Sequence, residues 1–215
     1  MKPYDLAAEF ISELGSLTEM STAPMRKIRR EYSKRLIYEN ASYVLEVVHS
    51  ILNSGRHRWI AYELIHDHPG AFHSLNIERL EVLGHGMNNW SSVDCFARTL
   101  SGPAWLEGML TESTIRDWAR SEDRWWRRAA LVSTVALNTR SHGGMGDAAK
   151  TLAICEMLIN DHEDTIVKAL SWALRALVNH NPEEVKEFIH VHEHVLAARI
   201  KREVRNKLTT GLKNP

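Results

Sequence analysis

The feature that most constrains the fold is a helical spacing of apolar residues that recurs along almost the whole chain. Apolar residues three and four positions apart share one face of an α-helix, and breaks such as Gly15, Pro69–Gly70 and Asn181–Pro182 separate the segments. No stretch alternates apolar and polar residues at period two for long enough to make a convincing strand. We therefore expect helices over residues 3–14, 22–38, 41–53, 56–66, 75–83, 101–110, 124–137, 145–158, 165–178, 183–190 and 195–208. Two more are expected, one that starts at residue 90 and one that ends near residue 119.

Short helices joined by short turns restrict the architecture further. Helix pairs that recur every 35–45 residues or so are typical of helical-repeat solenoids, although the chain contains no obvious internal repeat. An irregular helical bundle is the alternative. A chain of 215 residues is one domain by the usual expectation, and it is long enough to bury a full core. We expect one all-α helical-repeat domain over 1–215, an α-α superhelix.

The charge distribution indicates where a partner could bind. The formal net charge is zero, yet basic residues concentrate in the segments 24–35, 116–140 and 199–213. Each segment holds six basic residues, against one, three and one acidic residues respectively. Segregated charge of this kind can create a basic face on a neutral protein, although a charged run on a helix is more often a solvated surface. We expect the basic segments to lie on a concave face of the superhelix.

The remaining composition favours an intracellular protein. Cys95 and Cys155 lack metal or redox spacing, so we expect neither a disulfide nor a metal site from them. No apolar run is long enough for a membrane span and no signal-peptide pattern is present, so a cytoplasmic location is expected. The His190, His192 and His194 group lacks a completing ligand, and we expect it at the surface.

The most informative stretch is Asn88–Asp94. Two polar residues, Asn88 and Asn89, open it, and one of them can accept from the free N–H groups of a starting helix. Trp90 and Asp94 are four residues apart, so the indole and the carboxylate share one helical face. An unpaired carboxylate is costly in a core, whereas the pair suits the lining of a cleft.

Two further stretches place a tryptophan beside an arginine. Trp125 and Arg128 are three residues apart, and so are Trp172 and Arg175. Such pairs are usually core packing with a solvated guanidinium, and neither is informative alone.

Taken in order, these stretches resemble the AlkD family of HEAT-like-repeat alkylpurine DNA glycosylases. The resemblance rests on a W-x-x-x-D motif, a W-x-x-R-A-A motif and a K-A-x-x-W-x-L-R motif followed by N-P, and it covers residues 75–205 well and residues 1–74 loosely. The matching positions are Trp90, Asp94, Trp125, Arg128, Ala129, Ala130, Lys168, Ala169, Trp172, Leu174, Arg175, Asn181 and Pro182.

The resemblance implies a DNA repair enzyme that excises cationic N3- or N7-alkylated purines from duplex DNA. Asp94 would be the catalytic carboxylate, Trp90 and Trp172 would be aromatic walls of the lesion site, and Arg128 would contact the DNA backbone. Further backbone contacts are assigned to Arg26, Arg29, Arg127 and Arg175. The family needs no metal or organic cofactor, and a monomer acting on alkylated duplex DNA is expected.

Two departures from the family pattern keep an alternative open. The chain is neutral where family members are typically basic, and a family tyrosine falls at Ile28, with Tyr32 one turn further on. Some relatives have lost activity. The alternative is therefore a non-catalytic helical-repeat scaffold that binds nucleic acid or protein; the sequence leaves lesion preference, and the choice between DNA and RNA on charge alone, undecided.

Overall fold

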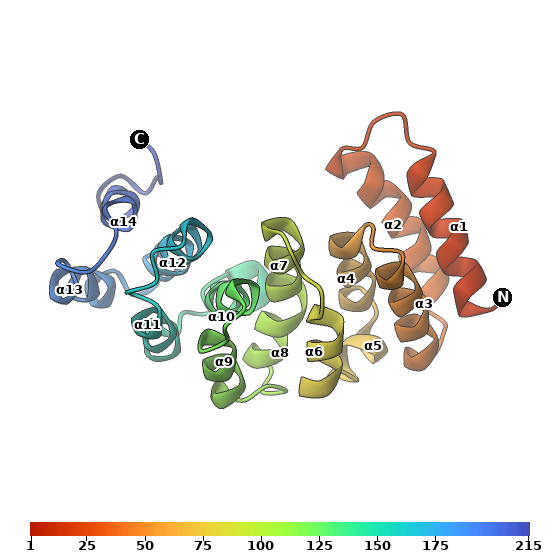
Figure 1. Ribbon diagram of the computed structural model, residues 1–215, viewed down its shortest axis with the longest axis horizontal. Coiled ribbons are helices and arrows are strands. Elements are labelled where there is room, and N and C mark those ends of the chain that lie inside the picture. The colour runs from red at the N-terminus through yellow and green to blue at the C-terminus, as the bar shows by residue number, and fades with distance from the viewer. The chain divides into compact units, whose positions relative to one another are not determined.

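A computed structural model describes all residues 1–215, and its regular structure is helical throughout, without a strand (Figure 1). This confirms the predicted all-α class. No helix combines the length and the apolar character that crossing a membrane requires. The chain forms two compact units, Met1–Gly86 and Met87–Pro215. The prediction of one domain over 1–215 stays a prediction.

The first unit is built from six helices. Its core is formed by apolar faces at helical spacing, with Phe10 and Tyr32 in edge-to-face contact at 4.8 Å between ring centroids. Helix α1 packs on α3, and α4 packs on both α2 and α3. The helices are α1 (Pro3–Gly15), α2 (Thr22–Leu36), α3 (Ala41–Asn53), α4 (Arg58–His66), α5 (Pro69–His73) and α6 (Ile77–Gly84).

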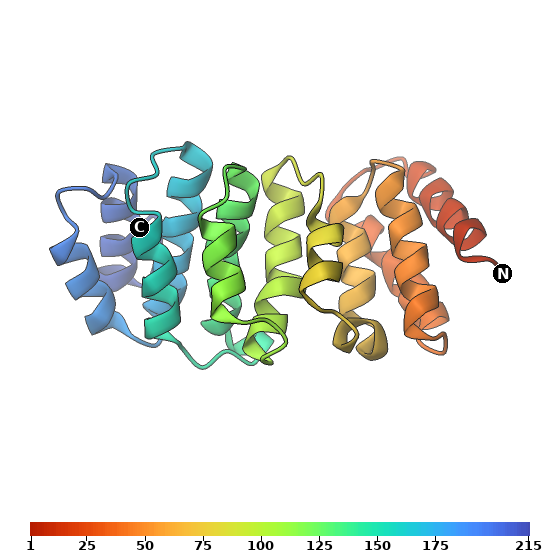
Figure 2. The ribbon, with the colours of Figure 1, turned by 60° about the horizontal axis from the view of Figure 1, so that its bottom comes forward.

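The second unit stacks its helices in two rows. Figure 1 shows α10, α12 and α14 following one another on one side, with α9, α11 and α13 on the other, and the turned view of Figure 2 shows neighbouring helices of this unit running alongside one another. The elements are α7 (Trp90–Phe96), η1 (Ala97–Ser101), α8 (Gly102–Leu106), α9 (Glu112–Ala119), α10 (Arg124–Leu137), η2 (Arg140–His142), α11 (Ala148–Met157), α12 (Asp164–Leu177), α13 (Pro182–Val191) and α14 (Ala198–Thr210).

Helix α10 is the centre of this unit. Every residue from Arg128 to Leu137 is buried, because α10 contacts α7, α8, α9, α11 and α12. An apolar helix of this kind is expected only where neighbours surround it. The stacking of helix pairs agrees with the predicted helical-repeat class, and it places α7 and α12 on either side of α10.

The predicted helices over 56–66, 145–158 and 195–208 start two or three residues later, at Arg58, Ala148 and Ala198, and two other boundaries differ more. Residues 69–70 were expected to be a break between helices, but they begin the short helix α5. Pro69 takes its first helical position, where the missing N–H costs nothing. The helix expected to start at Ser101 instead continues from α7 through a π-helical segment, η1. Gly102 permits this path, since a Cβ there would lie 2.6 Å from the Ala136 Cβ and 2.7 Å from the Ala97 carbonyl oxygen.

Candidate functional site

Helix α7 presents Trp90 and Asp94 as the spacing predicts. Asn89 caps the helix, and its side-chain oxygen accepts from the Ser92 backbone N–H at 3.0 Å and from the Ser92 hydroxyl at 2.9 Å. Trp90 is therefore the first helical residue, and its relative exposure is 65%. The Asp94 side chain, one turn later, is only 16% exposed. The face thus runs from an open indole to a half-buried carboxylate.

Asp94 is held by an arginine from α10. The Arg128 Nε donates to Asp94 Oδ1 at 2.7 Å, and its Nη2 donates to Oδ2 at 2.8 Å. The remaining Nη1 donates to the backbone carbonyl and the hydroxyl of Thr165 in α12. Such a bidentate pair fixes the plane of the carboxylate. Arg128 is itself 5% exposed, so its donors point at protein acceptors and away from solvent.

Burial has the largest effect on the pKa of Asp94. It raises the pKa of the carboxyl above its ordinary value, while the hydrogen bonds and charge of Arg128, and the charge of Arg98, act in the opposite direction without cancelling the effect. A carboxylate whose pKa is raised by burial beside a specific charge partner is a common feature of functional sites, although structural ion pairs share it.

A second contact joins the π-helical segment that continues α7 to helix α12. The Arg98 guanidinium lies over the Trp172 ring, 5.6 Å from the ring centroid. Arg98 follows Asp94 by four residues and lies in the π-helical segment, and Trp172 follows Thr165 by seven residues on α12. The sequence interpretation missed Arg98, although the spacing of Trp90, Asp94 and Arg98 at successive turns could have indicated it.

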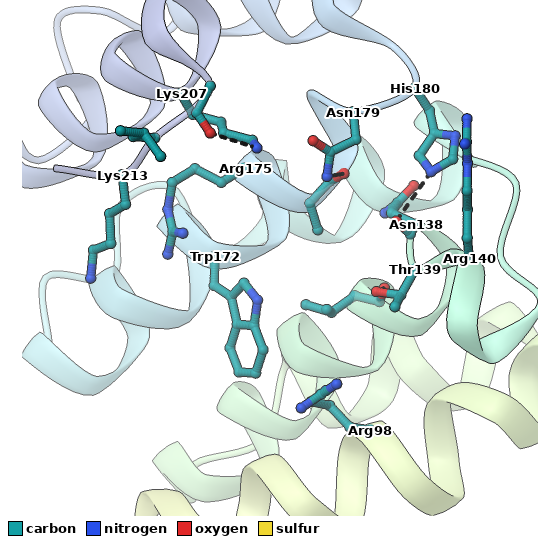
Figure 3. Close-up of a pocket in the computed structure, with 14 residues that line it drawn as sticks. Arg98, Asn138, Thr139, Arg140, Trp172, Arg175, Asn179, His180, Lys207 and Lys213 are labelled. Carbon is teal, nitrogen blue, oxygen red and sulfur yellow. Dashed lines mark hydrogen bonds between the residues drawn. The ribbon is translucent and has the colours of Figure 1, made fainter. Parts of the chain in front are cut away.

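Arg98 and Trp172 also line a cavity of about 730 Å³, which we call the basic pocket. Figure 3 shows Trp172 near its middle with Arg98 beneath it, Arg175 and Lys213 on one side, and Asn138, His180 and Arg140 on the other. No acidic residue lines the basic pocket, whereas five basic residues do: Arg98, Arg140, Arg175, Lys207 and Lys213.

One buried carboxylate lies behind this pocket. Glu203 accepts from the Ser171 hydroxyl at 2.7 Å, and its oxygens lie 3.8 Å from Arg175 Nε and 3.5 Å from Lys213 Nζ. Burial acts to raise the pKa of Glu203, but Ser171 and the surrounding cations bring it below its ordinary value. Glu203 therefore neutralises only part of the positive charge of the pocket.

The other wall of the pocket depends on a buried amide and a glycine loop. Asn138 is 3% exposed; its Nδ2 donates to the Thr134 carbonyl and the Thr151 hydroxyl, and its Oδ1 accepts from the Asp147 N–H. Gly146 has a φ of +94°, and a Cβ there would lie 2.5 Å from the His180 Cβ. The glycine-rich stretch after Ser141 thus serves close packing against His180.

The four other predicted backbone contacts all carry ion pairs. Arg26 and Arg29 pair with Glu63, and Arg29 also pairs with Asp67. Arg127 pairs with Asp161 at 2.8 Å and with Glu163 at 2.9 Å. Arg175 reaches Glu203 and Ser171. Their assignment to DNA contacts stays a prediction, and any such contact has to compete with these carboxylates.

Ion pairing extends through the three basic segments. Most of their basic side chains have a carboxylate within 4.0 Å; those without one are Lys27, Arg30, Arg140, Lys201, Arg202 and Lys207. The acidic residues that the sequence places elsewhere are thus folded back onto the basic segments. Two of these unpaired cations, Arg140 and Lys207, line the basic pocket together with Arg98.

The position of the absent family tyrosine is part of the core. Ile28 is 7% exposed and Tyr32 is 2% exposed, so neither side chain reaches a surface cleft. Tyr32 instead packs against Phe10. No group of three or more His, Cys, Asp or Glu side chains has the arrangement of a metal site.

Comparison with known proteins gives one match. The family model described as DNA alkylation repair enzyme matches residues 8–208. Neither the curated proteins nor the solved structures gave a match. The matched range includes α7, α10 and α12, and with them the Trp90, Asp94 and Arg128 motifs. Because the match extends over nearly the whole chain, the protein belongs to the DNA alkylation repair enzyme family.

Proposed function

We propose that the protein is a DNA glycosylase that hydrolyses the N-glycosidic bond of cationic N3- or N7-alkylated purines in duplex DNA. The observation that carries this proposal is the half-buried Asp94 carboxylate one helical turn from the exposed Trp90 indole. Membership of the family supports DNA as the substrate. Asp94 would be the essential group.

The chemistry requires one well-placed negative charge. An alkylated purine is already cationic, so when the bond from C1′ to the base nitrogen breaks, the electron pair leaves with the base and neutralises it. Positive charge then develops on the sugar, where the Asp94 carboxylate would stabilise it. Water adds at C1′ and releases its proton to the solvent through the carboxylate. No other reactant is consumed.

Arg128 fits a positioning role in this proposal. Its two bonds to Asp94 fix the carboxylate plane, and its bonds to Thr165 tie that plane to α12. The resemblance assigns Arg128 to the DNA backbone, but its donors are directed at Asp94 and Thr165. We therefore assign it to orienting the carboxylate, with the DNA phosphates left to other cations.

Trp90 would provide the surface for the lesion. Its exposed indole face can attract a cationic base through the ring quadrupole, a contribution of about 0.5–2 kcal/mol. Its position at the first turn of α7, fixed by the Asn89 cap, puts the ring on the same helical face as Asp94. A monomer that binds duplex DNA along a concave basic face completes the proposal.

The test is release of free base from methylated duplex DNA by the wild type and Asp94→Asn. Asparagine keeps the size of the side chain and can still accept from Arg128, but it carries no charge. We expect the single-turnover rate to fall by about 100-fold or more, the magnitude typical of losing an electrostatic stabiliser. Asp117→Asn is the matched control, because Asp117 is an exposed carboxylate paired only with Arg120. Equal rates for Asp94→Asn and the wild type would exclude Asp94 from the mechanism.

A second candidate, the non-catalytic scaffold, is favoured by one observation. Asp94 is committed to an ion pair with Arg128, as a purely structural carboxylate would be. Against the scaffold, Trp172 is only half-buried and Trp90 is open to solvent. Duplex binding that depends on salt, together with no base release from wild-type protein, would establish the scaffold.

A further inference from the structure

The two tryptophans assigned to the lesion site have different surroundings. Trp90 is 65% exposed, and no cation or aromatic ring lies against it. Trp172 is half-buried, and the Arg98 guanidinium already covers its face. On the face that Arg98 covers, a cationic base could stack on Trp172 only by displacing this arginine. Of the two, Trp90 is the one whose indole has no cation against it.

The charge around Trp172 also makes it a less favourable place for a cationic base than Trp90. Trp172 lies among the cations of the basic pocket, as Figure 3 shows for Arg98, Arg175 and Lys213. A positively charged base in this position would be repelled by like charges in a partly desolvated site. An anionic group in the same position would be attracted by all of them. The pocket therefore selects for negative charge.

Arg98 has a donor that the protein leaves unused. Its Nε is buried and has no hydrogen-bond partner, and no carboxylate lies within 4.0 Å of its guanidinium, although Asp94 is near enough for the two charges to interact. Buried donors without an acceptor are costly, and an isolated one in a native protein requires an explanation. A ligand oxygen in the basic pocket would satisfy this donor only if the guanidinium turned toward it, because Nε itself is closed to solvent. Arg140 and Lys207, which also line the pocket without a carboxylate partner, would add to the attraction.

We infer that the basic pocket binds a backbone phosphate of the DNA through Arg98, that Trp172 supports this arginine, and that Trp90 alone receives the cationic base. Arginine suits a phosphodiester because its planar N–H groups can donate to two non-bridging oxygens at once. The pocket volume of about 730 Å³ accommodates a phosphate with its sugar. The inference rests on the proposed function for the role of Trp90, whereas the phosphate site stands on the pocket itself.

The first experiment measures affinity for an undamaged duplex as a function of salt concentration. Loss of one phosphate contact lowers the magnitude of the slope of log affinity against log salt by about 0.9. We expect this decrease in Arg98→Met, which keeps the length of the side chain, and a slope close to the wild type in Arg98→Lys, which keeps the charge. Arg116→Met is the matched control, because Arg116 lies on α9 and pairs with Glu112 outside the pocket. An unchanged slope in Arg98→Met would overturn the inference.

The second experiment needs no substitution at Arg98. Inorganic tripolyphosphate, used as the anionic probe, should change the tryptophan emission of wild-type protein, and this change should be absent in Trp172→Phe. The same emission change in Trp172→Phe would place the anion elsewhere and overturn the inference.

The two proposals fail separately because neither binding experiment uses damaged DNA. Protein that binds tripolyphosphate at Trp172 but releases no alkylated base keeps the phosphate site and loses the glycosylase assignment. Protein that releases base while Arg98→Met retains the wild-type slope keeps the glycosylase and loses the phosphate site.

Discussion

At the scale of single residues, the Asp94–Arg128 pair joins the proposed chemistry to the stability of the second unit. Arg128 is buried, and Asp94 and Thr165 take its donors. Removing one member of such a pair leaves the other charge poorly solvated, which is more costly than replacing both. The pair therefore orients the carboxylate and also opposes the rise in its pKa that burial causes.

Replacing Arg128 by glutamine should move the acid limb of base release to higher pH. The proposed reaction needs the ionised carboxylate, so activity falls as pH drops through the Asp94 pKa. Burial already raises that pKa, and Arg128 opposes the rise. Without the guanidinium charge the pKa rises further, so activity is lost at a higher pH on acidification. The measurement is the pH dependence of the single-turnover rate. An acid limb that stays in place would show that Asp94 does not control the profile.

At the scale of elements, the start of α7 decides where Trp90 points. Asn89 caps the helix by accepting from the Ser92 N–H and hydroxyl, and its oxygen also accepts from the Ser91 hydroxyl at 2.8 Å. The helix then continues through the π-helical segment into α8. Such segments occur frequently at functional sites, and here the segment contains Arg98.

Replacing Asn89 by alanine should lower stability and activity together. Loss of an N-cap costs about 1 kcal/mol of unfolding free energy, and fraying of the first turn would release Trp90 from the face it shares with Asp94. Asn40→Ala is the matched control, because Asn40 caps α3 in the first unit by the same bond, to the Tyr43 N–H at 2.9 Å. We expect similar losses in urea unfolding from both variants and slower base release from Asn89→Ala only. Equal rates of base release in the two variants would show that the Asn89 cap does not position the site.

At the scale of the whole molecule, ion pairing limits the charge that DNA can meet. The net charge is zero, and most basic residues of the three basic segments have a carboxylate partner. Charge segregated along the sequence is therefore largely recombined in the fold. A polyanion either binds the remaining cations or opens existing ion pairs.

This compensation predicts a moderate salt dependence for binding to undamaged duplex DNA. If the phosphates are contacted only by Arg98 and by the six cations of the basic segments that lack a carboxylate partner, the slope of log affinity against log salt should have a magnitude of about 6 or less. The measurement is a titration at several salt concentrations. A magnitude near 10 would instead show that pairs such as Arg127–Asp161 open on binding.

The sequence by itself determined the helical class, most helix positions and the Trp90–Asp94 face. These features depend on local spacing: apolar residues recur with the helical period, and residues four apart share a face wherever a helix forms. The Asn89 cap and the start of α10 after Asp123 follow from local chemistry in the same way. The ordered motifs around Trp90, Arg128 and Trp172 also indicated the DNA alkylation repair enzyme family, and the match over residues 8–208 confirms it.

Only the tertiary structure decided which charges meet. Arg128 lies 34 residues from Asp94 in the sequence, and Glu203 reaches Ser171 across 32 residues, so no local pattern could pair them. The continuous path from α7 into α8 depends on the contact of Gly102 with Ala136, which a sequence pattern around Pro103 does not reveal. Arg98 over Trp172, and the pocket they share, arise because α7 and α12 both pack on α10. Spacing determines the face on which a side chain lies, whereas long-range packing determines its partner.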